Sequence, residues 1–113
     1  MQNLIPKQEE EEKRLKALAE YRILGTKPES CYDDITKIAA STCNVPISLM
    51  TLVDKDKQWF KSKVGLEINE TPRDWSFCTH AIKENSPLII EDAYQDERFI
   101  NNPLVTGDPK IRF

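Results

Sequence analysis

Cys78 and His80 are the two residues of this sequence whose types and spacing most suggest chemistry. A thiolate beside an imidazole can act as a nucleophile or supply half of a metal site. Here the two residues lie two positions apart in a segment expected to be helical, where such side chains point about 200° apart. They therefore cannot converge on one atom. The spacing predicts a small buried Cys78, a hydrogen-bonded His80, no catalytic residue and no metal site.

The other two cysteines, Cys31 and Cys43, bring the total to three. An odd number of cysteines without a CxxC pair is typical of free thiols in a reducing compartment, which indicates a cytoplasmic protein. Cys31 and Cys43 also lie on one predicted helix, roughly 18 Å apart along its axis, which is too far for a disulfide.

Length and charge narrow the classes of function. The chain has 113 residues and a net charge of -3, which suits one domain. No apolar run is long enough for a membrane helix, and the first residues lack the apolar stretch of a secretory signal. Basic residues are scattered beside acidic ones, so no patch for a phosphate backbone is expected. We therefore expect neither a membrane nor a nucleic acid as partner.

Two helices are predicted in the first part of the chain. Acidic residues four positions before basic ones, as in Glu9 and Lys13, favour a helix over residues 8–24, with Gly25 as its left-handed stop. A second helix is expected from Pro28 to Asn44, because apolar residues recur there at intervals of three and four. That spacing predicts one buried face, formed by Cys31, Tyr32, Ile35, Ile38, Ala39 and Thr42.

Three strands are predicted after these helices. Residues 45–53 carry apolar residues at both alternating sets of positions, as a central strand covered on both faces does. Residues 58–64 alternate with lysines and predict an antiparallel partner whose lysines face solvent. A short helix capped by Asp74 or Ser76 is expected to reach about Glu84, and residues 88–90 are expected to form the third strand.

The last part of the chain is expected to be rich in turns. Residues 92–109 predict one helical turn around residues 97–101, with Phe99 and Leu104 as buried anchors. Residues 110–113 resemble the beginning of a further strand. Because a central strand needs neighbours at both edges, the pattern predicts that the chain is the N-terminal portion of a larger domain.

Three segments together resemble the GAF domain of bacterial signalling proteins, in order and in spacing. They read AEYRILGTKPESCYDDITKIAASTCNVPISLMTLVDKDKQWFKSKVGL, ETPRDWSFCTHAI and PLIIEDAYQDERFINNPLVTGDPKIRF. The resemblance covers residues 14–113 and leaves residues 1–13 as a polar lead-in and helix start. It implies an α/β (α+β) fold, in which helices flank an antiparallel sheet that is truncated here before its last strands.

The resemblance also implies a function and a site. GAF domains serve as sensory or regulatory modules beside histidine kinases, diguanylate cyclases or phosphatases, so we expect this chain not to be an enzyme itself and to act on an output domain. The family pocket lies on the sheet, under the segments that correspond to residues 75–84 and 92–107. A small ligand of unknown identity is expected there, and no cofactor can be named. The predicted lining residues are Phe77, Cys78, His80, Ala81, Tyr94, Phe99 and Leu104.

Several other functions of the family are weighed against the sensor. Bilin-binding members have histidine directly after the attachment cysteine, whereas Thr79 intervenes here. The Asn-Lys-Phe-Asp-Glu signature of cyclic-nucleotide-binding members is absent from the sequence. Free methionine sulfoxide reductase shares the fold and works through cysteines, which leaves a thiol redox enzyme as an alternative. The other alternative is a ligand-free interaction module, and in either case we expect a homodimer formed through helices.

Overall fold

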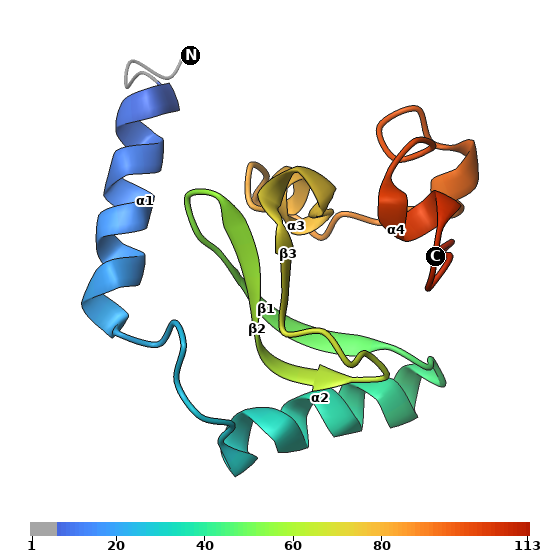
Figure 1. Ribbon diagram of the computed structural model, residues 1–113, viewed down its shortest axis with the longest axis horizontal. Coiled ribbons are helices and arrows are strands. Elements are labelled where there is room, and N and C mark those ends of the chain that lie inside the picture. The colour runs from blue at the N-terminus through green and yellow to red at the C-terminus, as the bar shows by residue number, and fades with distance from the viewer. Residues whose placement is uncertain (1–6) are drawn as a thin grey trace.

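The computed structural model describes residues 7–113 and places helices on both sides of a small antiparallel sheet (Figure 1). Helix α2 covers one face of the sheet, α3 and α4 lie on the other side, and α1 stands beside the tip of the hairpin formed by β1 and β2. Residues 1–6 of the predicted lead-in lie outside the described residues. The elements are α1 (Lys7–Tyr21), α2 (Ser30–Cys43), β1 (Ser48–Val53), β2 (Lys57–Val64), β3 (Glu70–Pro72), η1 (Arg73–Trp75), α3 (Cys78–Ala81), η2 (Ala93–Gln95) and α4 (Pro103–Thr106).

The predicted antiparallel hairpin is confirmed, but the central strand is β2. Strand order is β1-β2-β3, with both pairs antiparallel. Among the described residues β1 therefore lies at an edge, because the third strand pairs with β2. That third strand is Glu70–Pro72, which directly follows the loop after β2. The prediction of a strand at residues 88–90 is wrong: this segment joins no sheet, and Ile90 packs against the cluster around Phe99 instead.

A β-bulge in β2 brings Ser62 to the same side of the sheet as Lys61. Met50 pairs with Ser62 and Thr51 pairs with Phe60, so Lys61 is the extra residue. As a result Lys61 and Ser62 both reach the α2 side of the sheet, where they bind Thr26 and Thr36 respectively. The prediction that the lysines of this strand face solvent is wrong for Lys61, whose side chain is 0% exposed.

Helix α2 runs from Ser30 to Cys43, and the following Asn44 caps it in a left-handed conformation, as predicted. Its buried face is not the predicted one. Ile35 and Ile38 are 55% and 63% exposed, whereas Thr36 is 3% exposed. Thr36 Oγ1 lies 2.7 Å from Ser62 Oγ, which donates to Asp33 Oδ1 at 2.6 Å. This polar contact, rather than the apolar spacing, sets the face that α2 turns to the sheet.

The segment after β3 agrees with the sequence in its main features. Ser76 Oγ accepts from the amide of Thr79 and so caps α3, which ends at Ala81, before the predicted Glu84. The predicted anchors Phe99 and Leu104 are buried. Ala93, Phe99 and Val105 form a core cluster on which Phe77 and Ile90 pack. Residues 110–113 form no strand here.

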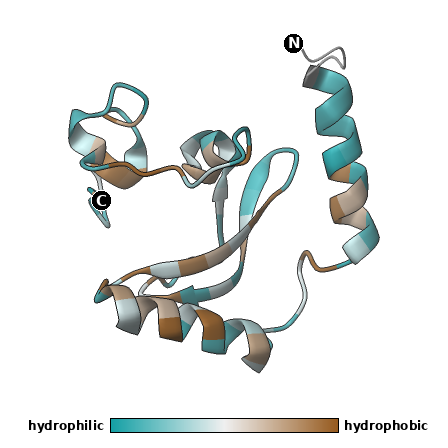
Figure 2. Ribbon diagram, turned by 180° about the vertical axis from the view of Figure 1, so that it is seen from behind, coloured by the Kyte–Doolittle hydropathy of each residue, from teal (hydrophilic) through white to brown (hydrophobic). Residues whose placement is uncertain are grey.

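Helix α1 is predominantly polar. It ends at Tyr21, three residues before the predicted end, and the following Arg22 takes a positive φ of 51°. Figure 2 shows that its first turns are hydrophilic, with hydrophobic residues only toward its C-terminal half. Leu18 is its buried residue among those described, and Leu15 is half-buried.

Candidate ligand cavity

An apolar cavity of about 110 Å³ lies on the face of the sheet opposite α2. The sheet provides its floor, the loop after Gly65 provides one wall, and α3, α4 and the C-terminal segment cover it. Apolar and hydroxyl-bearing side chains dominate the lining, which consists of Leu49, Thr51, Gln58, Phe60, Leu66, Ile68, Thr71, Phe77, Cys78, Leu104 and Ile111. Apolar walls with a few polar groups are typical of small-molecule sites.

The polar groups of the cavity bind one another. Thr51 Oγ1 donates to Cys78 Sγ at 3.3 Å, and Gln58 Nε2 lies 3.5 Å from Thr71 Oγ1. Ser76, just outside the lining, donates from Oγ to Gln58 Oε1 at 2.6 Å. Within residues 7–113 no buried side-chain nitrogen or oxygen lacks a hydrogen-bond partner. A ligand would therefore be held mainly by apolar contact, and a polar ligand would have to compete with these bonds.

Three of the seven predicted lining residues line this cavity: Phe77, Cys78 and Leu104. The other four lie nearby without lining it. Phe99 is 1% exposed and packs with its ring 4.5 Å from that of Phe77. His80 and Ala81 are half-buried on α3. Tyr94 is exposed, with the guanidinium of Arg112 over its ring.

Sequence reasoning missed the floor of the cavity. Thr51, Gln58 and Phe60 come from β1 and β2, and Thr71 comes from β3. Gln58 and Phe60 occupy alternate positions of one strand, so they share a face of the sheet. This alternation is the signal that could have identified them, once the side of the sheet that carries the cavity was known.

Cys78 and His80 do not act together. Cys78 accepts a hydrogen bond from Thr51, whereas the ring of His80 meets the edge of Phe99 with centroids 5.0 Å apart. Burial, followed by the positive charges of Lys83 and Arg98, lowers the pKa of His80 below its ordinary value of 6.5, against the opposing effect of Asp96. In the described part of the chain, no three His, Cys, Asp or Glu side chains gather in a way that could hold a metal ion.

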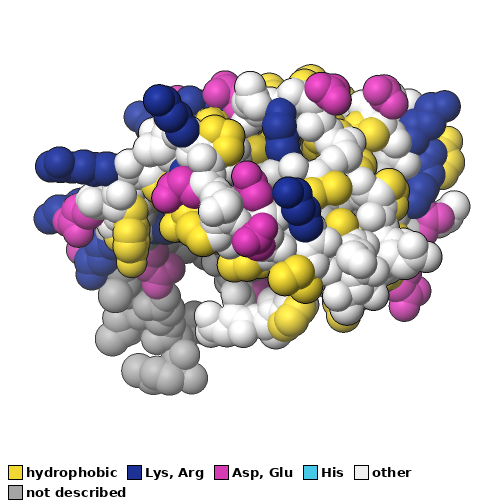
Figure 3. All heavy atoms as spheres, turned by 90° about the horizontal axis from the view of Figure 1, so that it is seen from below, with side chains coloured by type: hydrophobic (Ala, Val, Ile, Leu, Met, Phe, Trp, Pro, Cys, Tyr) yellow, Lys and Arg dark blue, Asp and Glu magenta, His cyan; other side chains and the backbone are white. Residues whose placement is uncertain are grey.

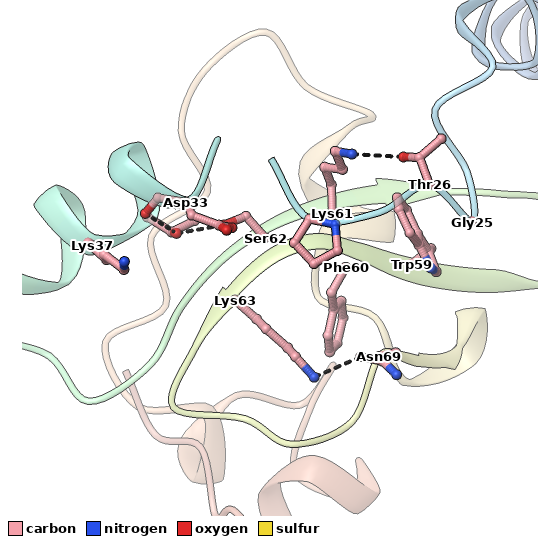
Figure 4. Close-up of a pocket in the computed structure, with 12 residues that line it drawn as sticks. Gly25, Thr26, Asp33, Lys37, Trp59, Phe60, Lys61, Ser62, Lys63 and Asn69 are labelled. Carbon is pink, nitrogen blue, oxygen red and sulfur yellow. Dashed lines mark hydrogen bonds between the residues drawn. The ribbon is translucent and has the colours of Figure 1, made fainter. Parts of the chain in front are cut away.

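A larger and more open hollow of about 590 Å³ lies on the α2 side of the sheet (Figure 4). Two of its lysines, Lys61 and Lys63, already have partners within the fold. Lys61 Nζ binds Thr26 Oγ1 at 2.8 Å and the Glu29 carboxylate at 2.6 Å. Lys63 Nζ binds Asn69 Oδ1 at 2.7 Å and two backbone carbonyls besides. These ammonium groups hold the linker before α2 and the loop before β3, so they support the fold rather than offer a free charged site.

The fold is that of a small α/β domain with a covered cavity on one face of its antiparallel sheet. The GAF domain family model matches residues 27–113, so the chain belongs to the GAF family. A cyclic di-GMP phosphodiesterase of Pseudomonas aeruginosa is 36% identical to it over 108 residues, which are 96% of this chain. The chain spans 18% of the length of that relative. Among residues 7–113, no helix has both the length and the apolar character that a bilayer crossing requires.

Proposed function

We propose that this GAF domain is a sensory module of a bacterial signalling protein and that it binds a small, mainly apolar ligand in the 110 Å³ cavity. The observation that carries the proposal is the position and lining of that cavity, which lies on the sheet under α3 and α4. We favour it over the larger hollow on the α2 side because the ammonium groups of Lys61 and Lys63 there are already bound within the chain.

The regulated activity would belong to an output domain, and none of the described residues needs to be catalytic. The relative from Pseudomonas aeruginosa is named a cyclic di-GMP phosphodiesterase. Turnover of a cyclic dinucleotide is therefore the output that we propose ahead of a kinase. Ligand binding would favour one of two arrangements of the domain, which requires that the ligand bind them with different affinity. We also propose that the domain forms a homodimer through its helices and acts in the cytoplasm.

The experiment is a thermal-shift screen of metabolite fractions on three forms of the chain. Leu104→Phe places a ring in the cavity, and Ile89→Phe makes a similar change at a position that is 71% exposed and does not line it. A ligand of the cavity is expected to raise the melting temperature of the wild type and of Ile89→Phe, but not of Leu104→Phe. Equal shifts for all three forms would place binding elsewhere.

The second candidate function is a ligand-free interaction module, which is favoured by the exposed apolar residues of α2. Ile35 and Ile38 lie on the outer side of this helix, and Figure 3 shows apolar side chains among charged ones on that side of the molecule. If no fraction stabilises the domain, and Ile38→Glu abolishes a concentration-dependent dimer, the interaction module is the better description.

A further inference from the structure

Helix α1 contacts the rest of the domain through a narrow strip of side chains. Glu11, Arg14, Leu15 and Leu18 follow the spacing of one helix face, and they are the half-buried or buried residues among those described in α1. Two leucines are a small apolar contact for a helix of 15 residues. The polar residues of the strip therefore matter for holding α1 in place.

The carboxylate of Glu11 joins α1 to the sheet by ion pairs. Arg14 binds it with two nitrogens, at 2.9 Å and 2.8 Å, and Arg73 Nη1 binds it at 2.6 Å. Arg14 Nη1 also donates to the carbonyl of Val53, and Arg73 Nη1 donates to that of Lys55 at 3.2 Å. One carboxylate thus connects α1 to η1, while Arg14 also connects α1 to the end of β1 and Arg73 reaches the turn that follows β1.

The ion pairs of Glu11 with Arg14 and Arg73 form at neutral pH, and they are exposed enough for salt to weaken them. The hydrogen bonds from Arg14 and then Arg73 lower the pKa of Glu11 to about 2, so the carboxylate is charged at neutral pH. The three side chains are 20–31% exposed, so water and salt reach them.

Arg73 belongs to the segment that also forms part of the cavity wall. Thr71, two residues earlier, lines the cavity. The carbonyl of Arg73 accepts from Thr79 Oγ1 of α3 at 3.2 Å, and its amide donates to Asp56 O at 3.0 Å. The carbonyl of Trp75 accepts from Asn102 Nδ2, next to α4, at 2.9 Å. Residues 71–76 therefore lie between the cavity and α1.

The C-terminal end of α1 continues into a linker that is bound to the sheet. Lys61 holds the linker between α1 and α2 through Thr26, Glu29 and the carbonyl of Lys27, which accepts from Nζ at 2.6 Å. Because this ammonium is fully buried, the linker is held more firmly than the exposed end of the helix. Lys61 therefore holds the linker at the C-terminal end of α1, and Glu11 holds the N-terminal half of the helix.

We propose that the contact of Glu11 with Arg73 is a releasable latch that sets the position of α1, and that changes at the cavity wall reach α1 through it. The existence of the latch is independent of any ligand. Its use as a signal rests on the proposed sensory function. In the latched state the N-terminal half of α1 is tied to η1, and in the released state the contacts of Leu15 and Leu18 and the linker held by Lys61 keep the helix attached.

Amide hydrogen exchange in α1 tests the latch without a ligand. A free helix of this length is only marginally stable in water, so a released α1 exchanges faster. Glu11→Gln and Arg73→Gln are each expected to speed exchange in α1 about fivefold. Glu11→Gln also removes the pair with Arg14, so the double variant is compared with Glu11→Gln and is expected to add little to it, because the ion pair between Glu11 and Arg73 is already lost. Glu9→Gln, at an exposed position of the same helix, is the control and should leave the rates unchanged.

Exchange in β2 separates release from unfolding, since it should stay constant when only α1 detaches. If a variant unfolds, the wild type under rising salt gives the same answer. Raising ionic strength from about 0.05 M to about 0.5 M should speed exchange in α1 of the wild type and not of Glu11→Gln. No response of α1 to Glu11→Gln in a folded protein, or to salt in the wild type, overturns the latch.

Leu104→Phe then tests transmission from the cavity. It is expected to change exchange in α1 of the wild type and to leave α1 of Glu11→Gln unaffected. No change in the wild type refutes transmission. Because this variant fills the cavity without a ligand, the result does not depend on the metabolite screen, whose failure would count against the sensory function alone.

Discussion

Gly65 offers the sharpest test of how the loop over the cavity is built. It ends β2 with a φ of +84°, and a Cβ placed on it would lie 2.0 Å from the carbonyl oxygen of Pro46 and 3.2 Å from Ile47 Cγ1. Gly25 is a matched position, with a φ of +73° and nothing within 4 Å of the same added atom. Alanine at either site would be strained by the left-handed backbone. At Gly65 its Cβ would also collide with the segment that precedes β1.

The difference between the two sites can be estimated. A left-handed alanine costs about 1 kcal/mol, which is the whole effect expected for Gly25→Ala. At Gly65 the added atom strikes a backbone carbonyl, so the two segments must move apart, which costs about 1–3 kcal/mol more. Gly65→Ala is therefore expected to lower the free energy of unfolding by about 2–4 kcal/mol in total.

Urea unfolding followed by tryptophan fluorescence measures both variants, because Trp59 is buried in the native state. Leu66 and Ile68 follow Gly65 and line the cavity, so Gly65→Ala should also weaken stabilisation by any ligand found in the screen. Equal losses for the two alanine variants would refute the reasoning, since they would show that the contact with Pro46 has no energetic consequence.

Two further predictions concern titration and burial. Because the folded state lowers the pKa of His80, the unfolded chain binds the proton more readily, and stability should fall as the pH drops from 6.5 through the folded pKa. His80 is the single histidine of the sequence, so NMR can follow its titration directly, and His80→Gln should flatten the pH profile of urea unfolding. Lys61→Met should destabilise the domain by about 1–3 kcal/mol, because it removes the hydrogen bonds from Lys61 to Thr26 and to the carbonyl of Lys27. The loss stays moderate because the half-exposed Glu29 carboxylate is hydrated once its partner is gone. Lys37→Met, at an exposed position of α2 on the rim of the same hollow, should change stability by less than about 0.5 kcal/mol in the same unfolding experiment.

Local patterns predicted those elements of the fold that depend on neighbours in the chain. The hairpin, the left-handed end of α2 at Asn44 and the burial of Phe99 and Leu104 all follow from short stretches of sequence. The buried face of α2 does not, because it depends on a hydrogen bond between Thr36 and Ser62 that joins residues 26 positions apart. Apolar spacing alone favours the opposite face, with Ile35 and Ile38 inside.

The lysines of β2 show a second limit of pattern reading. Alternation correctly places Lys61 on the side of Trp59, but it does not show that the linker before α2 covers this side, where Lys61 binds Thr26 and the carbonyl of Lys27. The bulge opposite Met50 and Thr51 brings Ser62 to the same side. The same non-local pairing brings Thr51 and Gln58 to the floor of the cavity, where the sequence indicated only residues of the covering segments. The family resemblance indicated Phe77, Cys78 and Leu104 of the covering segments, and strand pairing supplies the floor of the cavity that they line.

The small size of the cavity is compatible with control of α1 once the energies are compared. A partly exposed ion pair contributes about 1 kcal/mol, so the equilibrium of the latch changes about fivefold when the pair is lost. Very small ligands can gain up to about 1.5 kcal/mol per non-hydrogen atom. Suppose that the free energies of binding to the latched and released states differ by the contribution of a single ligand atom. That difference would then be as large as the free energy that the ion pair contributes to the latch. A latch based on a large apolar interface would require a much larger ligand than 110 Å³ can hold, so the weak ionic contact of α1 and the small cavity suit one another.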